Sequence, residues 1–339
     1  MKKQKLIALA GGFCLIVLVT AWAAPAPAAE AVIQWRLQHM FPAGCFDAEF
    51  TQNFCDYVWK ASGERLKITK YGMGTLAPAT EMLSAVGARV FEMGYTGSAY
   101  HAGKIPEAIL GFTLPFLYRD LMETIIVSNK VGIKDILRES YQQHNVYLLS
   151  LGPLSHVEIF SKVPIRKVAD FKGVKMRASG MAGDVLRKIG AVPTFVPGPE
   201  IYQGLEKGVL DAALWGDTNT NIDLGFPEVT KYEIHPTTIT IGDIYVNMDA
   251  WKALPDDLKV TLELAADKFG VDFCTKSVFM IPSARRKLVD KYGFELITLP
   301  ESELVKAREY SMAVLDDYAK KSPRAERIVK ALKEYFATR

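Results

Sequence analysis

The chain has 339 residues, and its 41 Lys and Arg stand against 38 Asp and Glu, which gives a formal net charge of +3. A charge this close to zero offers no electrostatic argument for binding nucleic acid or an anionic membrane. The length exceeds what one hydrophobic core usually holds, so we expect two domains or lobes.

The first 28 residues have the pattern of an export signal. Three lysines precede an apolar run over residues 6–24, and residues 25–28 read Pro-Ala-Pro-Ala, an A-x-A cleavage pattern. The run is also long enough for a membrane anchor, but its Ala/Pro-rich exit favours cleavage. Three lysines and no acids would leave with residues 1–28, so the mature chain would have a formal charge of 0. We therefore expect a periplasmic protein.

Strand and helix signals alternate in the first part of the mature chain. The predicted strands cover residues 33–37, 66–71 and 90–95, and the predicted helices cover 46–62 and 80–89. This βαβ alternation predicts an α/β fold with a mainly parallel sheet.

The same alternation returns later, with a strand at 191–196, a helix at 199–207 and a strand at 209–214. Residues 81–94 and 200–213 follow the same pattern: each begins with a glutamate, continues as a predicted helix, and then has a valine, an apolar residue and an acidic residue in succession. This is expected if the two lobes contain the same structural unit. Coincidence is the alternative, because any passage from helix to strand looks similar.

Ligands of open α/β sheets bind where the strands end. We therefore expect the residues just after two predicted strands to face a shared cleft. These residues are Tyr95 and Thr96 after one strand, and Trp215, Gly216 and Asp217 after the other.

The last third of the chain is mostly helical. Residues 255–291 predict a helix of roughly 50 Å, long enough to span both lobes, which Pro282 should kink or divide. A strand at 294–297 follows, and residues 301–339 are helical apart from a break near Ser322-Pro323.

The cysteines predict neither a disulfide nor a zinc site. Cys45 and Cys55 stand ten residues apart along the first predicted helix, a separation of about 15 Å that a disulfide cannot bridge. We expect both, and Cys274, to be buried thiols. With no CxxC motif and five histidines, a structural zinc site is not expected.

Four segments, in order, resemble the solute-binding proteins of tripartite ATP-independent periplasmic (TRAP) transporters, the DctP family. They are LKITKYGMGTLAP (66–78), TLPFLY (113–118), ADFKGVKMR (169–177) and IYQGLEKGVLDA (201–212). The resemblance covers nearly the whole mature chain and is nearest to the branch that binds 2-oxo acids and related monocarboxylates.

This resemblance implies a two-lobed, type II-like periplasmic binding protein with a long helix spanning both lobes. On this basis we expect residues 29–153 and 243–283 to form lobe I, and residues 154–242 and 284–339 to form lobe II. The implied ligand is a small organic carboxylate, with 2-oxo and 2-hydroxy acids favoured, and the implied partners are the TRAP membrane permease subunits.

The chain departs from the metal-using members of that branch. They have a carboxylate immediately before the cleft tryptophan and a glutamine on the preceding lobe-crossing strand, where this chain has Leu214 and His156. Their C-terminal dimerising extension is also missing. We therefore expect no bound metal, no other cofactor, and a monomer.

Arg177 and Trp215 are the main candidate ligand contacts. The Arg177 guanidinium presents two parallel N–H donors that match a carboxylate, and it keeps its charge in a desolvated cleft. An interlobe salt bridge is the alternative role. The Trp215 ring could pack on the ligand while its indole N–H donates to an oxygen, with core packing as the alternative.

The other candidates are polar residues near the expected cleft. His156, near the first lobe crossing, could donate to a ligand oxygen or add a positive charge, although a lone histidine is often structural. Tyr95, Thr96 and Tyr100 could donate hydrogen bonds from their hydroxyl groups, or their side chains could simply pack at the rim of the cleft.

Asp217, Asn219 and Asn221 alternate as in a calcium loop. The segment lacks the Gly and closing Glu of such a loop, so a solvated turn is favoured over a metal site. Asp217 and Asn219 remain candidate ligand contacts.

The sequence has none of the common catalytic signatures. We find no Gly-x-Ser-x-Gly elbow, His-Glu-x-x-His pair, phosphate loop or Gly-x-Gly-x-x-Gly. We therefore predict a receptor that binds its ligand without catalysis. A sensor that reports to a membrane kinase is the first alternative, and a periplasmic hydrolase or lyase is the second.

Overall fold

The computed structural model describes residues 31–44 and 46–338, and Val32–Arg339 form one compact unit. The predicted signal segment and Cys45 lie outside the described residues. Among the described helices, none is both long and apolar enough to cross a membrane.

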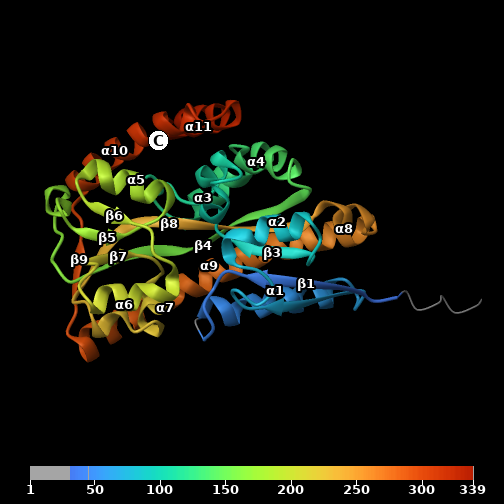
Figure 1. Ribbon diagram of the computed structural model, residues 1–339, viewed down its shortest axis with the longest axis horizontal. Helices are drawn as coiled ribbons and strands as arrows, with labels where there is room; N and C mark the ends of the chain where they lie inside the picture. The colour runs from blue at the N-terminus through green and yellow to red at the C-terminus, as the bar shows by residue number, and fades with distance from the viewer. Residues whose placement is uncertain (1–30, 45, 339) are drawn as a thin grey trace, which may run out of the picture. The chain divides into compact units, whose positions relative to one another are not determined.

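The described strands form one sheet, in the order β2-β1-β3-β8-β4-β7-β5-β6, with β9 also paired to β8 (Figure 1). Their bounds are β1 Ile33–His39, β2 Leu66–Tyr71, β3 Met93–Thr96, β4 Val146–Ser161, β5 Lys175–Arg177, β6 Val192–Thr194, β7 Ala212–Leu214, β8 Tyr232–Asn247 and β9 Glu295–Thr298.

The long antiparallel strands β4 and β8 join two halves of the sheet. One end of β8 pairs with β3, where Met93 lies opposite Val246, and its other end pairs with β9, where Tyr232 lies opposite Glu295. The far end of β4 pairs with β7. The β4–β8 register shifts in three places, one of them next to His156.

The prediction of a mainly parallel sheet is confirmed for the short strands only. The strands β1, β2 and β3 pair in parallel, as do β5, β6 and β7. The sequence did not reveal β4 and β8, whose pairing with each other and with β3 and β7 is antiparallel.

Helices cover the sheet and connect its strands (Figure 1). They are α1 Phe46–Ala61, α2 Met82–Gly87, α3 Leu121–Asn129, α4 Ile133–Gln142, α5 Gly180–Ile189, α6 Ile201–Glu206, α7 Thr218–Asp223, α8 Met248–Ala253, α9 Asp256–Tyr292, α10 Glu301–Ala319 and α11 Pro323–Phe336.

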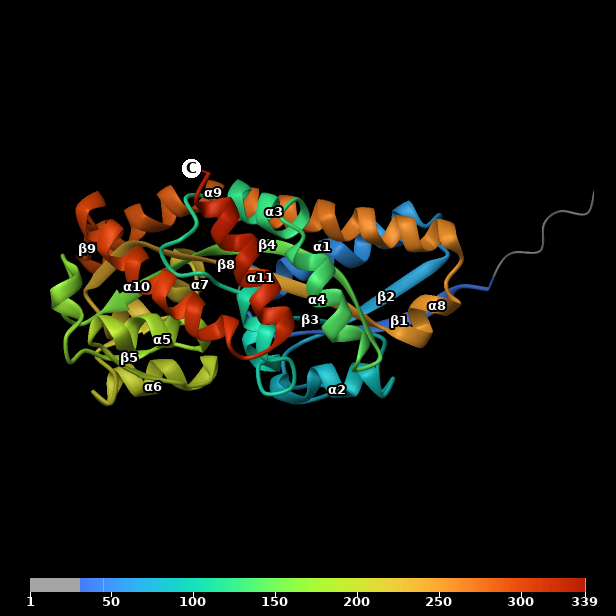
Figure 2. The same cartoon turned by 90° about the horizontal axis from the view of Figure 1, so that it is seen from above.

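Helix α9 is the predicted spanning helix. It packs along β4 and also contacts α1 in one half and α7 in the other. Figure 2 shows it as one long helix running from α8 towards β9. Of the two effects expected of Pro282, a kink or a division, the division is wrong, because α9 continues through that residue to Tyr292. The predicted break between α10 and α11 is confirmed at residues 320–322.

Several predicted strands are shorter than expected. The strand predicted at 90–95 begins at Met93, because Arg89 has a φ of 57° and Val90 lies exposed in the turn that follows α2. The strands predicted at 191–196 and 209–214 shrink to β6 and β7, and the helix predicted between them is α6, preceded by a 3-10 turn.

Aromatic side chains hold α1 against α9. The ring of Phe50 lies edge-on to Phe273 with centroids 5.2 Å apart, and Phe54 lies 5.7 Å from Phe269. Cys55 and Cys274 are buried free thiols, as predicted.

Candidate functional site

A cleft lies between the two halves of the sheet. Its lining includes Met40 and Phe41 after β1, Arg177 at the end of β5, Trp215 after β7, and Thr238 on the crossing strand β8. Its cavity volume is about 80 Å³, or about 870 Å³ when the open solvent at its mouth is included, and most of its lining side chains are apolar or aromatic. A mainly apolar and aromatic lining with a few polar groups is usual for a small-molecule site.

Arg177 and Trp215 meet because β5 and β7 are parallel neighbours. Arg177 lies opposite Ala213 in their register, so both side chains emerge at the carboxyl edge of the sheet. The Arg177 guanidinium lies 4.5 Å from the Trp215 ring centroid. Its Nε donates to the Val196 carbonyl at 3.0 Å and its NH1 to the Leu214 carbonyl at 2.9 Å.

Arg177 has no ion-pair partner among the residues that the structure describes, although it is only 4% exposed. Burial lowers the pKa of Arg177 to about 10, and nearby Tyr100 acts in the opposite direction. The side chain therefore stays protonated at neutral pH. The alternative of an interlobe salt bridge finds no support here, and a buried unpaired cation favours an anionic ligand.

Trp215 is held in place by close packing on Gly198. A Cβ atom at residue 198 would lie 2.6 Å from the Trp215 ring, so only glycine leaves the ring its position. The Trp215 Nε1 is buried without a hydrogen-bond partner in the described structure. Phe195, 53% exposed, adds a second ring, 5.7 Å from the Arg177 guanidinium.

Of the three candidate residues from the first half of the sheet, one lines the cleft and two do not. Tyr100 lines the cleft, and burial raises the pKa of its hydroxyl. Tyr95 and Thr96 are not among the described lining residues. The Tyr95 ring packs edge-on against Phe41 at 5.3 Å and Phe269 at 5.5 Å.

Thr96 belongs instead to a buried polar network. Its Oγ1 lies 2.8 Å from His101 Nε2, and Asp243 accepts hydrogen bonds from Thr96 at 3.4 Å and from the Tyr141 hydroxyl at 2.7 Å. Thr96 therefore has a structural role behind the cleft.

Asp217, Asn219 and Asn221 lie behind the lining residues Gly216 and Thr220. Asp217 caps α7 by accepting the Thr220 N–H at 2.8 Å. Asn221 donates to the Gly216 carbonyl at 2.9 Å and accepts its N–H at 3.2 Å, which fixes the chain after Trp215.

The expected solvated turn is wrong, because Asp217 and Asn221 are buried. The Asn219 Nδ2 is also buried, without a hydrogen-bond partner in the described structure.

His156 lies in a different cavity. This second cavity is lined by His156, residues 116–119, residues 236–239 and parts of α10 and α11. Burial and the Arg285 guanidinium lower the pKa of His156, with a smaller opposite effect from Asp120. The structure does not bring His156 together with Arg177, so the predicted place of His156 among the ligand contacts finds no support in the described cleft.

The sequence reasoning missed a cleft residue at the start of α1. Asp47 lines the cleft, is 7% exposed and accepts a hydrogen bond of 3.1 Å from Thr220 on α7. In the sequence it looked like an ordinary acid in a first helical turn, which is favourable there in any protein.

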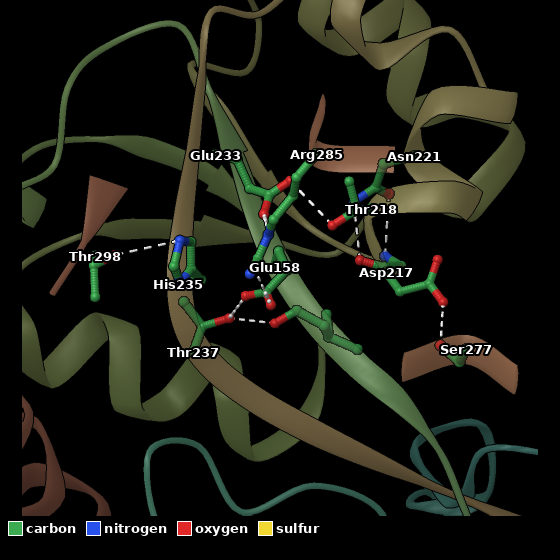
Figure 3. Close-up of polar contacts among 12 residues, drawn as sticks. Glu158, Asp217, Thr218, Asn221, Glu233, His235, Thr237, Ser277, Arg285 and Thr298 are labelled. Atoms are coloured by element: carbon green, nitrogen blue, oxygen red, sulfur yellow. Dashed lines mark hydrogen bonds and ion pairs between the residues drawn. The ribbon is translucent and has the colours of Figure 1, made fainter. Parts of the chain in front are cut away.

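A buried charge cluster beside the cleft was also missed (Figure 3). Arg285 of α9 donates to Glu233 of β8 at 2.5 Å and to Glu158 of β4 at 3.1 Å. Thr218 adds a hydrogen bond of 3.0 Å to Glu233. Burial and the neighbouring Glu233 raise the pKa of Glu158 to about 8. One arginine thus joins both crossing strands to the spanning helix.

The described residues contain no group of three or more His, Cys, Asp or Glu side chains that could hold a metal ion. The Leu214 carbonyl accepts a hydrogen bond of 2.9 Å from Arg177. The absence of a bound metal remains a prediction.

The sequence model of DctP, the bacterial extracellular solute-binding protein family 7, matches residues 38–322. This chain belongs to that family. The predicted family and the predicted class of extracytoplasmic solute receptor are confirmed, and the periplasmic location agrees with the family.

Individual relatives are distant but cover most of the chain. A monocarboxylate 2-oxoacid-binding periplasmic protein of a Nostoc species is 25% identical, over 89% of this chain and 84% of its own. The 2,3-diketo-L-gulonate-binding periplasmic protein of Escherichia coli is 24% identical, over 84% and 86%.

Solved TRAP solute-binding proteins have the same fold. One from Bordetella bronchiseptica, with calcium and picolinate, has a TM-score of 0.81 at 24% identity and covers 91% of this chain and 93% of its own. One from Pseudoalteromonas atlantica, with sodium and pyruvate, has a TM-score of 0.78 at 25% identity, over 91% and 94%. The predicted two-lobed α/β class is confirmed.

Proposed function

We propose that this solute-binding protein captures a small organic carboxylate in the cleft and delivers it to the membrane permease of a TRAP transporter. The observation that carries the proposal is Arg177, a cation that is 4% exposed and has no carboxylate partner among the described residues. A carboxylate would accept two parallel N–H bonds from its planar fork and neutralise it. The favoured ligands are 2-oxo and 2-hydroxy acids.

The relatives support a carboxylate of this size. One relative is named for 2-oxoacids, and another, from Rhodobacter capsulatus, is a C4-dicarboxylate-binding protein. A Bordetella pertussis receptor of the same fold binds pyroglutamic acid. These ligands differ in shape, but each carries a carboxylate.

Binding without catalysis fits the lining of the cleft. The described lining residues include no histidine, cysteine or lysine, and the carboxyl group of Asp47 accepts a hydrogen bond from Thr220 of α7.

Lobe closure completes the mechanism. Lobe I, residues 29–153 and 243–283, would carry Tyr100 and Asp47, and lobe II, residues 154–242 and 284–339, would carry Arg177 and Trp215. Contacts made in the closed form alone shift the open–closed equilibrium towards the form that the permease recognises. A micromolar dissociation constant requires about 8 kcal/mol, which a desolvated Arg–carboxylate pair and aromatic contacts can supply.

A thermal-shift screen of mono- and dicarboxylates tests the proposal, because a ligand that binds the folded state alone raises the melting temperature. At least one acid should do so, and the matching amides should not. If no acid in the screen raises the melting temperature, the proposal is wrong. Recovery of a membrane kinase with the mature chain, in place of a permease, would favour the sensor alternative.

A further inference from the structure

Asp47 presents one unpartnered carboxyl oxygen beside the cleft. Its Oδ2 accepts a hydrogen bond from Thr220 Oγ1 at 3.1 Å. Its Oδ1 is buried and has no hydrogen-bond partner in the described structure. Both residues line the cleft. A buried polar atom without a partner is costly, so Oδ1 indicates a bond that the bound solute completes.

A second buried carboxyl, that of Asp217, lies behind Thr220. Asp217 Oδ1 accepts the Thr220 N–H at 2.8 Å, and its Oδ2 accepts the Ser277 hydroxyl at 2.6 Å (Figure 3). Neither aspartate has an ion-pair partner among the described residues. Two neighbouring buried carboxyls without a cation do not both ionise.

The hydrogen bonds decide which of the two keeps the proton. Asp217 has donors on both oxygens, which stabilise its carboxylate form, and Asp47 has one. Asp47 is therefore the better site for the shared proton. Its Oδ1, which has no partner in the described structure, is the oxygen that can offer this proton to a ligand.

We propose that Asp47 is a specificity residue that remains a neutral carboxylic acid and donates its Oδ1–H to an oxygen of the bound solute. The inference rests on the proposed carboxylate-binding function and adds a second recognition point to it. The cleft then offers three kinds of donor, which are the remaining N–H groups of Arg177, the Trp215 Nε1–H and the Asp47 Oδ1–H. The solute that fits is an anion with a second oxygen acceptor, such as an oxo group or another carboxylate.

Amino acids are the class that this arrangement excludes. An ammonium group only donates, so beside Asp47 and Arg177 it would face donors and a positive charge. A 2-oxo acid of the same skeleton replaces that group with an acceptor. The predicted order of affinity is therefore the 2-oxo acid first, then the unsubstituted acid, then the amino acid.

The acidic groups around Asp47 all raise its pKa. Asp217 and Asp223 of α7 are acidic, Tyr95 of β3 is a neutral phenol, and α9 contributes the Ser277 hydroxyl to Asp217. Burial and Asp217 hold the pKa of Asp47 well above its usual range, and the Thr220 hydroxyl opposes them weakly. Ligand affinity should then fall as the pH rises through that pKa, because the ionised form cannot donate.

The test is calorimetry with wild type, Asp47→Asn and Asp47→Leu, using matched 2-oxo, unsubstituted and 2-amino acids. Asparagine keeps a neutral donor, so Asp47→Asn should bind the 2-oxo acid within about threefold of wild type. Leucine removes the donor and should lose at least about tenfold, which is about 1.4 kcal/mol. Asp56→Asn, on the exposed side of the same helix, is the matched control.

A pH series on wild type gives a reading that does not depend on any variant folding. The affinity of wild type should decline as the pH is raised and Asp47 ionises, while that of Asp47→Asn should stay level. Equal losses in Asp47→Asn and Asp47→Leu, or a preference for amino acids, would mean that Asp47 is an ionised acceptor. That result would overturn the inference while carboxylate binding stood. Failure of every acid to bind wild type would instead overturn the proposed function.

Discussion

The Arg177 guanidinium lies 4.5 Å from the centroid of the Trp215 ring, and its Nε and NH1 groups donate to the carbonyls of Val196 and Leu214. Stacking sets the plane of the guanidinium, and the two carbonyls set its rotation within that plane. The remaining N–H groups therefore have a fixed direction before any ligand arrives, which reduces the entropy lost on binding.

Arg177→Lys should weaken carboxylate binding at least about tenfold and leave the fold intact. A lysine ammonium is a point charge that cannot reproduce the planar fork or its stacking on Trp215. Calorimetry with the strongest acid from the thermal-shift screen measures the loss. Arg187→Lys on α5, where the side chain is 61% exposed, is the control. Unchanged affinity in Arg177→Lys would remove Arg177 from the site.

Gly198→Ala should reduce affinity several-fold without removing any polar contact. The new methyl group would lie 2.6 Å from the Trp215 ring and would push the indole from its place beside Arg177. Trp215 fluorescence should shift in the same variant. Gly103→Ala adds a methyl group in open space and should bind as wild type does. Normal affinity in Gly198→Ala would show that the exact position of the indole does not matter.

The stability of the fold should decrease as the pH rises from about 5 to about 8, in part because of Glu158. Its pKa in the folded protein is about 8, above the usual value of 4.5, so the folded state holds a proton that the unfolded chain has lost. The stabilisation from this group is complete below the unfolded pKa and is lost as the pH approaches 8.

Chemical denaturation of Glu158→Gln should show a shallower pH slope than wild type, by on the order of 1 kcal/mol per pH unit. Glu139→Gln is the control, because Arg327 holds the pKa of Glu139 below its usual value and outside this window. An identical slope in wild type and Glu158→Gln would contradict the prediction.

Chelator should leave ligand affinity unchanged. Leu214 offers no side-chain oxygen, and the described residues contain no group of three or more His, Cys, Asp or Glu side chains that could hold a cation. Calorimetry before and after treatment with a chelator, then after adding back calcium or sodium, decides the matter. A loss of affinity that the added ion restores would show a metal-assisted site like those of the calcium- and sodium-bound neighbours.

The sequence predicted the site where contiguous residues specify it. Arg177 ends one short family segment and Trp215 closely follows another, and the parallel pairing of β5 and β7 follows from the βαβ pattern. Tyr95 was also placed correctly at a strand end, but the face of the strand was not predicted, and its ring turns towards Phe41 and Phe269.

Contacts between residues that are far apart in the chain could not be predicted from local sequence patterns. The Thr220–Asp47 hydrogen bond joins residues 173 positions apart, and the Arg285–Glu158 hydrogen bond spans 127 positions. Each of these residues has an ordinary surface role in its local sequence. Their burial depends on how the halves pack, which local patterns do not encode.

The strands β4 and β8, which both halves share, also determine where the chain can be divided into separately expressed parts. Each pairs with neighbours in both halves, so a boundary drawn at residue 153 would divide β4 and leave part of β8 without its partner. Exposed strand edges of this kind attract other chains and lead to aggregation. Either lobe expressed alone should therefore be insoluble, and fusion or circular-permutation designs should place new termini in the loops outside these two strands.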